Sequence, residues 1–128
     1  SHNIKLETNF ETFEEVKIFG VKSELSQVLI AIVSNSIDVL KNVKNPKVKI
    51  DIFSSSAEVI IKLADNGGGI KAKNLKKIFE PYFSTKEEGT GIGLYLAKMI
   101  IEESFGGKIL VENQKEGVLF SLFIEKAL

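Results

Sequence analysis

The segment IFEPYFSTKEEGTGIGL, residues 78–94, carries the most specific pattern in the chain. Aromatic residues flank a proline in its first half, and in its second half a lysine precedes three glycines at alternating positions. The glycine spacing and the weak apolar periodicity predict a mobile loop over residues 81–93. The end of the segment, GTGIGL, opens directly into a helical pattern, which presents free backbone N–H groups and a positive dipole end to an anion. A flexible hinge ahead of a helix is the alternative interpretation.

A second pattern, DNGGGI, spans residues 65–70 and follows an alternating apolar stretch. An aspartate at a strand end, followed by glycines, lets the backbone approach a flat ligand closely while the carboxylate accepts hydrogen bonds from its donor edge. An ordinary glycine-rich turn would have the same composition.

Asn35 lies farther upstream, on the flank of an apolar helical stripe. A polar amide in that position needs a partner. It is either hydrogen-bonded to a neighbouring carbonyl, or it offers its oxygen to a hard cation such as Mg2+ near a phosphate. Both interpretations fit the residues alone.

Hydrophobic periodicity predicts the elements around these patterns. Helices are expected over residues 23–45, 71–79 and 94–105, and strands over residues 4–10, 16–19, 48–52, 59–65, 109–111 and 119–124. Ser23 is a candidate N-cap of the first helix, and glycines at 106 and 107 end the third. The alternation of strands and helices, without a repeat or a linker, predicts one two-layer α/β domain over residues 1–128.

Composition bounds the possible functions. The 128 residues are 44% hydrophobic and 27% charged, which suits one globular domain with a core. Seventeen acidic residues balance seventeen basic ones, so no net field attracts the chain to nucleic acid or to an anionic membrane surface. The longest apolar run, residues 28–33, is much shorter than the roughly 20 residues of a membrane-spanning helix. The absence of cysteine excludes disulfides and thiolate sites and favours the cytoplasm.

Every basic residue is a lysine, so phosphate would be held by lysine, backbone N–H groups or a metal rather than by a guanidinium fork. No GxxxxGK[ST] string occurs in the sequence. The third glycine of a GxGxxG pattern would fall on Leu94 or Leu96. These observations exclude a P-loop protein and a dinucleotide-binding protein.

Asn35, DNGGGI, IFEPYFSTK and GTGIGL occur in the order of the N, G1, F and G2 boxes, and the sequence resembles the catalytic, ATP-binding domain of bacterial sensor histidine kinases. The resemblance covers essentially the whole chain, and the F and G2 boxes are near-consensus. It implies the Bergerat fold, which these kinases share with type II topoisomerases, MutL mismatch-repair proteins and heat-shock chaperones. That fold is a mixed β-sheet covered on one face by helices, with a mobile ATP lid.

The resemblance also implies roles for individual residues. Asn35 would be the magnesium ligand, and Asp65 would accept a hydrogen bond from the adenine amino group. The residues implied to border the purine are Gly67, Gly69 and Ile70. Those implied in the lid are the anchors Phe79 and Phe83, then Lys86 near the terminal phosphates, and Gly89, Thr90, Gly91, Gly93 and Leu94 along the phosphates. Asn35 and Lys86 would be the catalytic residues, with ATP and Mg2+ as cofactors.

Three departures from the family pattern are visible. Ala31 stands where relatives often carry a second asparagine, which puts a second metal contact in doubt. Asp38 stands where many relatives have a lysine. Val118 follows Gly117 where a Gly-Thr pair is common.

Such domains transfer the γ-phosphoryl group of ATP to a histidine on a separate dimerisation domain, for relay to an aspartate of a response regulator. The resemblance therefore implies partners in the protein's own dimerisation and phosphoacceptor domain, which is absent here, and in a response regulator. It implies a homodimeric intact protein whose catalytic domain is cytoplasmic and not inserted in a membrane, whether or not the sensor is membrane-anchored. Nucleic acid is not an expected partner. The alternatives are a protein serine kinase of the anti-sigma-factor type, an ATP-hydrolysing machine such as gyrase or MutL, and a non-catalytic nucleotide-binding module.

Overall fold

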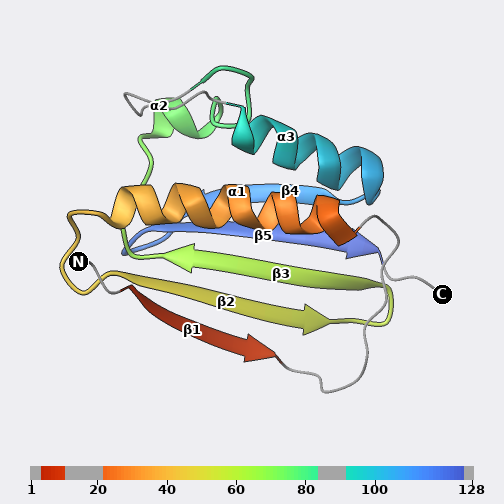
Figure 1. The fold of residues 1–128 in the computed structure, drawn as a ribbon, viewed down its shortest axis with the longest axis horizontal. Coiled ribbons are helices and arrows are strands. Elements are labelled where there is room, and N and C mark those ends of the chain that lie inside the picture. The colour runs from red at the N-terminus through yellow and green to blue at the C-terminus, as the bar shows by residue number, and fades with distance from the viewer. Residues whose placement is uncertain (1–3, 11–21, 84–91, 126–128) are drawn as a thin grey trace.

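The computed structural model describes residues 4–10, 22–83 and 92–125 of the chain (Figure 1). The helices lie on one face of a single sheet. In chain order the elements are β1 (Lys5–Phe10), α1 (Lys22–Leu40), β2 (Lys47–Ser54), β3 (Glu58–Asp65), α2 (Ala72–Leu75), α3 (Gly93–Met99), the π-helical segment η1 (Ile100–Ser104), β4 (Lys108–Asn113) and β5 (Val118–Glu125). The predicted strand over residues 16–19 lies outside the described residues.

The five strands have the spatial order β1-β2-β3-β5-β4. β1 is parallel to β2, whereas every other neighbouring pair is antiparallel. Two short hairpins, β2–β3 and β4–β5, build most of the sheet, and the parallel edge pair is joined through α1. The predicted mixed sheet, covered by helices on one face, is confirmed.

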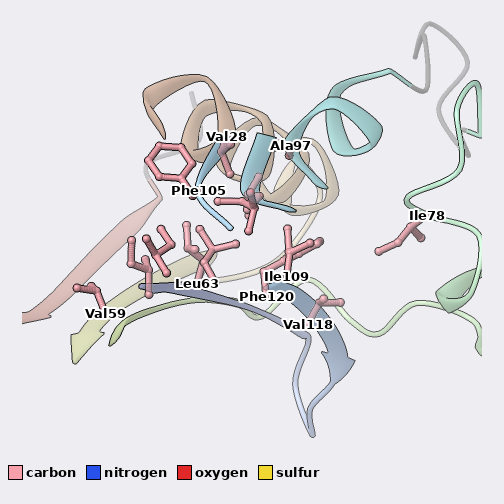
Figure 2. Packing of buried hydrophobic residues seen from close by; sticks show 14 residues of the cluster. Val28, Val59, Leu63, Ile78, Ala97, Phe105, Ile109, Val118 and Phe120 are labelled. Carbon is pink, nitrogen blue, oxygen red and sulfur yellow. The ribbon is translucent and has the colours of Figure 1, made fainter. Parts of the chain in front are cut away.

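Strand alternation places one set of side chains under the helices. Val59, Ile61 and Leu63 of β3 are buried, and Leu63 pairs with Phe120 of β5, which is fully buried. Figure 2 shows these side chains filling the space between the sheet and the helices. The complete cluster is Val28, Ile32, Val59, Ile61, Leu63, Ile78, Ala97, Ile101, Phe105, Ile109, Val118, Phe120, Leu122 and Ile124. Burial of this apolar surface is the main force that holds the two layers together.

α1 is the long helix of the domain. Val28, Ile32 and Leu40 recur at the spacing of one helix face and are fully buried. The helix ends at Leu40, earlier than predicted, and turns lead to Asn45, which has a positive φ of 55°. Asn45 precedes Pro46, and a residue before proline is disfavoured in the α conformation.

Within the described part of the chain, the segment Ser23–Leu40 is long and apolar enough to cross a membrane by length and composition alone. The sequence analysis did not predict this property, because it counted only consecutive apolar residues. Val28, Ile32 and Leu40 of this segment are fully buried against the rest of the domain, whereas Ile30, Ile37 and Val39 are exposed.

The predicted helix over residues 71–79 is only partly formed. α2 covers Ala72–Leu75, and turns continue the chain, with Lys77 N–H donating to Asn74 C=O and Glu80 N–H to Lys77 C=O. None of the residues of α2 is buried, and Ile78, which belongs to the core, follows in the turns rather than in the helix.

The third predicted helix is present as α3 followed by η1. The π-helical segment was not predicted, and its wider turn includes the bond from Phe105 N–H to Ile100 C=O. Gly106, with φ of 59°, ends the helical path, as the glycine pair predicted.

Candidate functional site

Asp65 ends β3 beneath α1 and is only 8% exposed. Its Oδ1 accepts a hydrogen bond from Gly67 N–H at 3.0 Å, and its Oδ2 accepts one from the Ser36 hydroxyl at 3.2 Å. Burial raises the pKa of the Asp65 carboxyl above its ordinary value, while the bonds from Gly67, Ser36 and the Val118 backbone act in the opposite direction. The carboxylate that the sequence predicts as an acceptor at this strand end is therefore held in a defined orientation.

The glycine-rich loop after Asp65 is fixed at its start by Asn66. The Asn66 Oδ1 accepts a hydrogen bond from Lys47 N–H at 2.7 Å, and its Nδ2 donates to Asn45 C=O at 2.9 Å. One side chain thus ties the loop to the connection between α1 and β2. The sequence analysis did not identify Asn66, because an Asp-Asn-Gly string is also typical of an ordinary turn.

The same loop is fixed at its end by Asn113, the last residue of β4. The Asn113 Oδ1 accepts a hydrogen bond from Ile70 N–H at 2.7 Å, and its Nδ2 donates to Ile70 C=O at 2.8 Å. Between the two asparagines, Gly68 N–H donates a hydrogen bond to Glu116 C=O at 3.0 Å, and the backbone of Gly68 has a positive φ of 83°. The loop therefore has a defined shape before any ligand binds.

Close packing explains two of the glycines around Asp65. A Cβ on Gly67 would lie 2.8 Å from Val39 Cγ2, and a Cβ on Gly117 would overlap the Asp65 carbonyl. The sequence analysis noted Gly117 only as the residue before Val118, but the backbone of Gly117 lies against that of Asp65. Neither position has room for a side chain.

Asn35 is partly buried on α1, immediately before Ser36. Its side chain forms no hydrogen bond with another residue that the structure describes. One helical turn earlier, the Cβ of Ala31 lies 3.7 Å from the position that a Cβ on Gly93 would occupy. The first residue of α3 therefore meets α1 beside Asn35.

The two predicted lid anchors, Phe79 and Phe83, pack against the core. The Phe79 ring meets the Phe120 ring edge-to-face at a centroid distance of 6.2 Å, and the Lys98 ammonium lies 5.5 Å from the Phe79 centroid. Phe83 is partly buried against the same cluster. Tyr82 differs, because it is 79% exposed and has a φ of 66°, an unusual conformation for an aromatic residue.

The structure thus brings together one group of the predicted site residues. Asp65, Gly67, Gly69 and Ile70 form a fixed loop against α1, and Ile70 and Leu94 pack on the core. Four of the predicted site residues, and most of the predicted mobile loop, lie outside the described residues: Lys86, Gly89, Thr90 and Gly91. Three hydrogen-bonding residues of this region were missed: Ser36, Asn66 and Asn113.

A mixed sheet under helices, with a buried aspartate and a glycine-rich loop at a strand end, makes this chain a two-layer α/β domain. Residues 20–128 match the family described as "Histidine kinase-, DNA gyrase B-, and HSP90-like ATPase". The chain belongs to this family of ATP-binding domains.

Individual relatives agree with the family. Sporulation kinase C of Bacillus subtilis is 32% identical over 122 residues, which are 95% of this chain and 28% of that protein. The chain thus spans little more than a quarter of the length of this curated relative.

Solved structures give the same result. The catalytic domain of histidine kinase ThkA is 33% identical, with a TM-score of 0.86 over 96% of this chain and 80% of that one. A structure of ThkA in complex with response regulator protein TrrA matches with 32% identity and a TM-score of 0.76, over 95% of this chain and 34% of that one. The chain has the fold of a histidine kinase catalytic domain.

Proposed function

We propose that this chain is the ATP-binding catalytic domain of a sensor histidine kinase, which binds Mg-ATP and provides the γ-phosphoryl group to a histidine on a separate dimerisation domain. The observation that carries the proposal is the buried Asp65 carboxylate at the start of a loop that Asn66 and Asn113 hold in place. A charged acceptor beside closely approaching backbone is suited to the amino edge of adenine.

Asn35 is the proposed magnesium ligand. Mg2+ usually keeps several waters and takes few protein oxygens besides phosphate oxygens, so a single amide oxygen fits its coordination chemistry. Asn35 is partly buried, and no described residue occupies its amide. Bound there, the ion would neutralise charge on the phosphates. The contact between Gly93 and Ala31 supports this position, because it brings the end of the glycine string beside α1.

The remaining phosphate contacts are assigned to the lid. Lys86 and the backbone N–H groups of Gly89, Thr90, Gly91, Gly93 and Leu94 are proposed to face the β- and γ-phosphates. Phe79 and Phe83 hold the first end of this segment on the core. Of these residues only Phe79, Phe83, Gly93 and Leu94 are described by the structure.

The proposed chemistry needs little covalent help from this domain. In the transfer, a histidine nitrogen bonds to the γ-phosphorus while the bond to the β-phosphate oxygen breaks, and ADP leaves with the electron pair. Phosphoryl transfer of this kind has a loose transition state and depends on positioning and charge neutralisation. The residues of this chain would hold the purine and the phosphates, whereas the histidine and any proton acceptor belong to the partner domain.

The same proposal covers the partners. By analogy with the kinase–regulator complex of ThkA, a response regulator would receive the phosphoryl group. The intact protein would be a homodimer through its dimerisation domain, with this domain in the cytoplasm. The solved neighbours reported above are structures of a histidine kinase, which favours this function over a serine kinase, a gyrase-like machine or a non-catalytic module.

The proposal is tested by phosphoryl transfer from this domain's ATP to a separately produced dimerisation domain. The domain is incubated with Mg-ATP labelled at the γ-phosphate and with a separately produced dimerisation domain that carries the acceptor histidine. Acid-labile phosphate on that domain, lost when the domain carries Asn35→Ala, is the expected result. Acid-stable phosphoserine on a partner would favour the serine kinase. ATP binding that is weak and indifferent to magnesium would favour a non-catalytic module.

A further inference from the structure

Ser36 is a buried polar side chain of α1 that none of the proposed ligand contacts uses. It is 3% exposed, and its hydroxyl donates to Asp65 Oδ2 across 29 positions of the chain. Buried hydroxyls are normally hydrogen-bonded, but most side-chain hydrogen bonds go to the backbone or to water. A direct bond from a helix hydroxyl to a carboxylate of the site is therefore a specific feature of this domain.

The two oxygens of Asp65 have different protein partners. Oδ1 accepts the N–H of Gly67 from the loop, and Oδ2 accepts the hydroxyl of Ser36 from the helix. A carboxylate offers about four acceptor positions, so these bonds leave capacity for a ligand donor. The Val118 backbone is a third donor to the carboxyl, and Ser36 is the one donor that comes from α1. Because the donors come from the loop, from β5 and from the helix, together they fix the rotation of the carboxylate about its Cβ–Cγ bond.

We propose that Ser36 is a positioning residue that orients Asp65 toward the ligand and thereby sets the preference of the site for a purine with an exocyclic amino group. This inference rests on the proposed function, since Asp65 must be the base acceptor. Without the hydroxyl, one buried oxygen of Asp65 would lose its partner from the helix, and the carboxylate could rotate or take up a proton. Either change removes an oriented acceptor for the amino group.

The position of Ser36 also relates the two ends of the proposed site. Ser36 follows Asn35 directly, and neighbouring residues on a helix point about 100° apart. One rigid turn of α1 thus orients the acceptor of the base through Ser36 and presents Asn35 on its flank. Orientation by a helix is more exact than orientation by a loop, because helix side chains are restricted to few rotamers.

The experiment compares ADP with inosine diphosphate, which has an oxo group in place of the 6-amino group. Both are titrated calorimetrically without metal, into the parent chain and into Ser36→Ala. The parent is expected to prefer ADP. The substitution should weaken ADP binding about tenfold, the value of one charged hydrogen bond, and leave inosine diphosphate binding nearly unchanged. A merely structural role would weaken both ligands equally.

Ser121→Ala is the matched control. Ser121 is also a buried serine, 7% exposed, but its register with Lys62 and Leu110 places it on the sheet face away from the helices. It should keep the parent preference for ADP. Ser36→Cys fills nearly the same space with a weak S–H donor, so its preference should fall between those of the parent and Ser36→Ala.

The outcomes separate the inference from the proposed function. If the parent binds both diphosphates equally, Asp65 does not read the amino group, and the base-recognition part of the proposed function is wrong. If the parent prefers ADP and Ser36→Ala keeps that preference, the inference about Ser36 is wrong. Full preference in Ser36→Cys would also overturn it, because occupied space rather than the hydroxyl would then be sufficient. Thermal unfolding of each variant establishes that it is folded.

Discussion

The side chain of Asn113 pairs with both backbone groups of Ile70, accepting from the N–H at 2.7 Å and donating to the C=O at 2.8 Å. The pairing reproduces one step of a β-ladder with a side chain in place of a strand. It joins the end of β4 to the end of the glycine-rich loop, 43 positions apart. The loop beside Asp65 is therefore held by the β4–β5 hairpin as well as by α1.

Asn113→Ala is expected to weaken ADP binding by roughly three- to tenfold, because two exposed hydrogen bonds that shape the loop are lost. Amide hydrogen exchange at Gly69 and Ile70 should accelerate in the ligand-free variant. Gln114→Ala, which changes the next side chain of the same hairpin, is the control. Unchanged affinity together with faster exchange would show that ligand binding does not require the preformed loop.

Asp65→Asn should change stability in a pH-dependent manner. Burial raises the pKa of Asp65 in the folded protein, so the folded state binds a proton at pH values where the unfolded chain is already ionised. The free energy of unfolding then falls as pH rises from the ordinary aspartate pKa through the raised one. An asparagine does not ionise, so the variant does not lose unfolding free energy in this way. Its stability relative to the parent should therefore rise across that pH window, and the difference should persist at neutral pH.

Urea unfolding of both proteins in the same series of buffers measures this difference, since other titrating groups contribute equally to both. ADP affinity should fall in the same variant, because an amide is a weaker acceptor than a carboxylate and can present its NH2 group to the base. A stability difference that does not vary with pH would contradict the account of a buried, ionised Asp65.

Asn35→Ala should spare ADP binding in the absence of metal and weaken the Mg-ATP complex roughly tenfold or more, because one oxygen ligand of the ion is lost. Calorimetric titrations with and without magnesium provide the comparison. Ser34→Ala, an exposed neighbour on the same helix, serves as the control. Equal losses with and without metal would indicate that Asn35 has a structural role.

Gly117→Ala should be among the most damaging substitutions in the domain, because the new Cβ would overlap the Asp65 carbonyl. We expect a loss of about 2–3 kcal/mol in unfolding free energy, typical of overpacking in a close-packed region. Gly68→Ala is the informative comparison: no atom lies near its Cβ position, and only its φ of 83° opposes a side chain. Its cost should be about 1 kcal/mol. Similar costs at both positions would disprove a close approach at Gly117.

Periodicity alone predicted the parts of the fold whose side chains alternate between core and solvent. The β2–β3 hairpin is an example, since Val59, Ile61 and Leu63 are buried on every second position. The end of α1 and the length of α2 were predicted wrongly, because both depend on tertiary packing and on the left-handed Asn45 rather than on apolar spacing. The π-helical turn of η1 has no sequence signal of its own.

The predicted site residues were those that belong to recognisable strings. Ser36, Asn66 and Asn113 were missed because each acts through a partner that is distant in sequence. A serine beside Asn35 on an apolar helix was a usable signal, since a buried hydroxyl needs a partner just as an amide does. Asn113 could not be found in this way, because an exposed asparagine at the end of a strand is ordinary.

The strand order has a consequence for how the domain is made. β5, the last of the described strands in the chain, lies between β3 and β4, and β4 has no other neighbour in the sheet. While a ribosome is still translating Val118–Glu125, β3 exposes an unpaired edge and the segment of β4 has nothing to pair with. The sheet can therefore be completed only after β5 has emerged from the ribosome. A chain arrested at Asn113 would expose the unpaired edge of β3, which could pair with other nascent chains and cause aggregation.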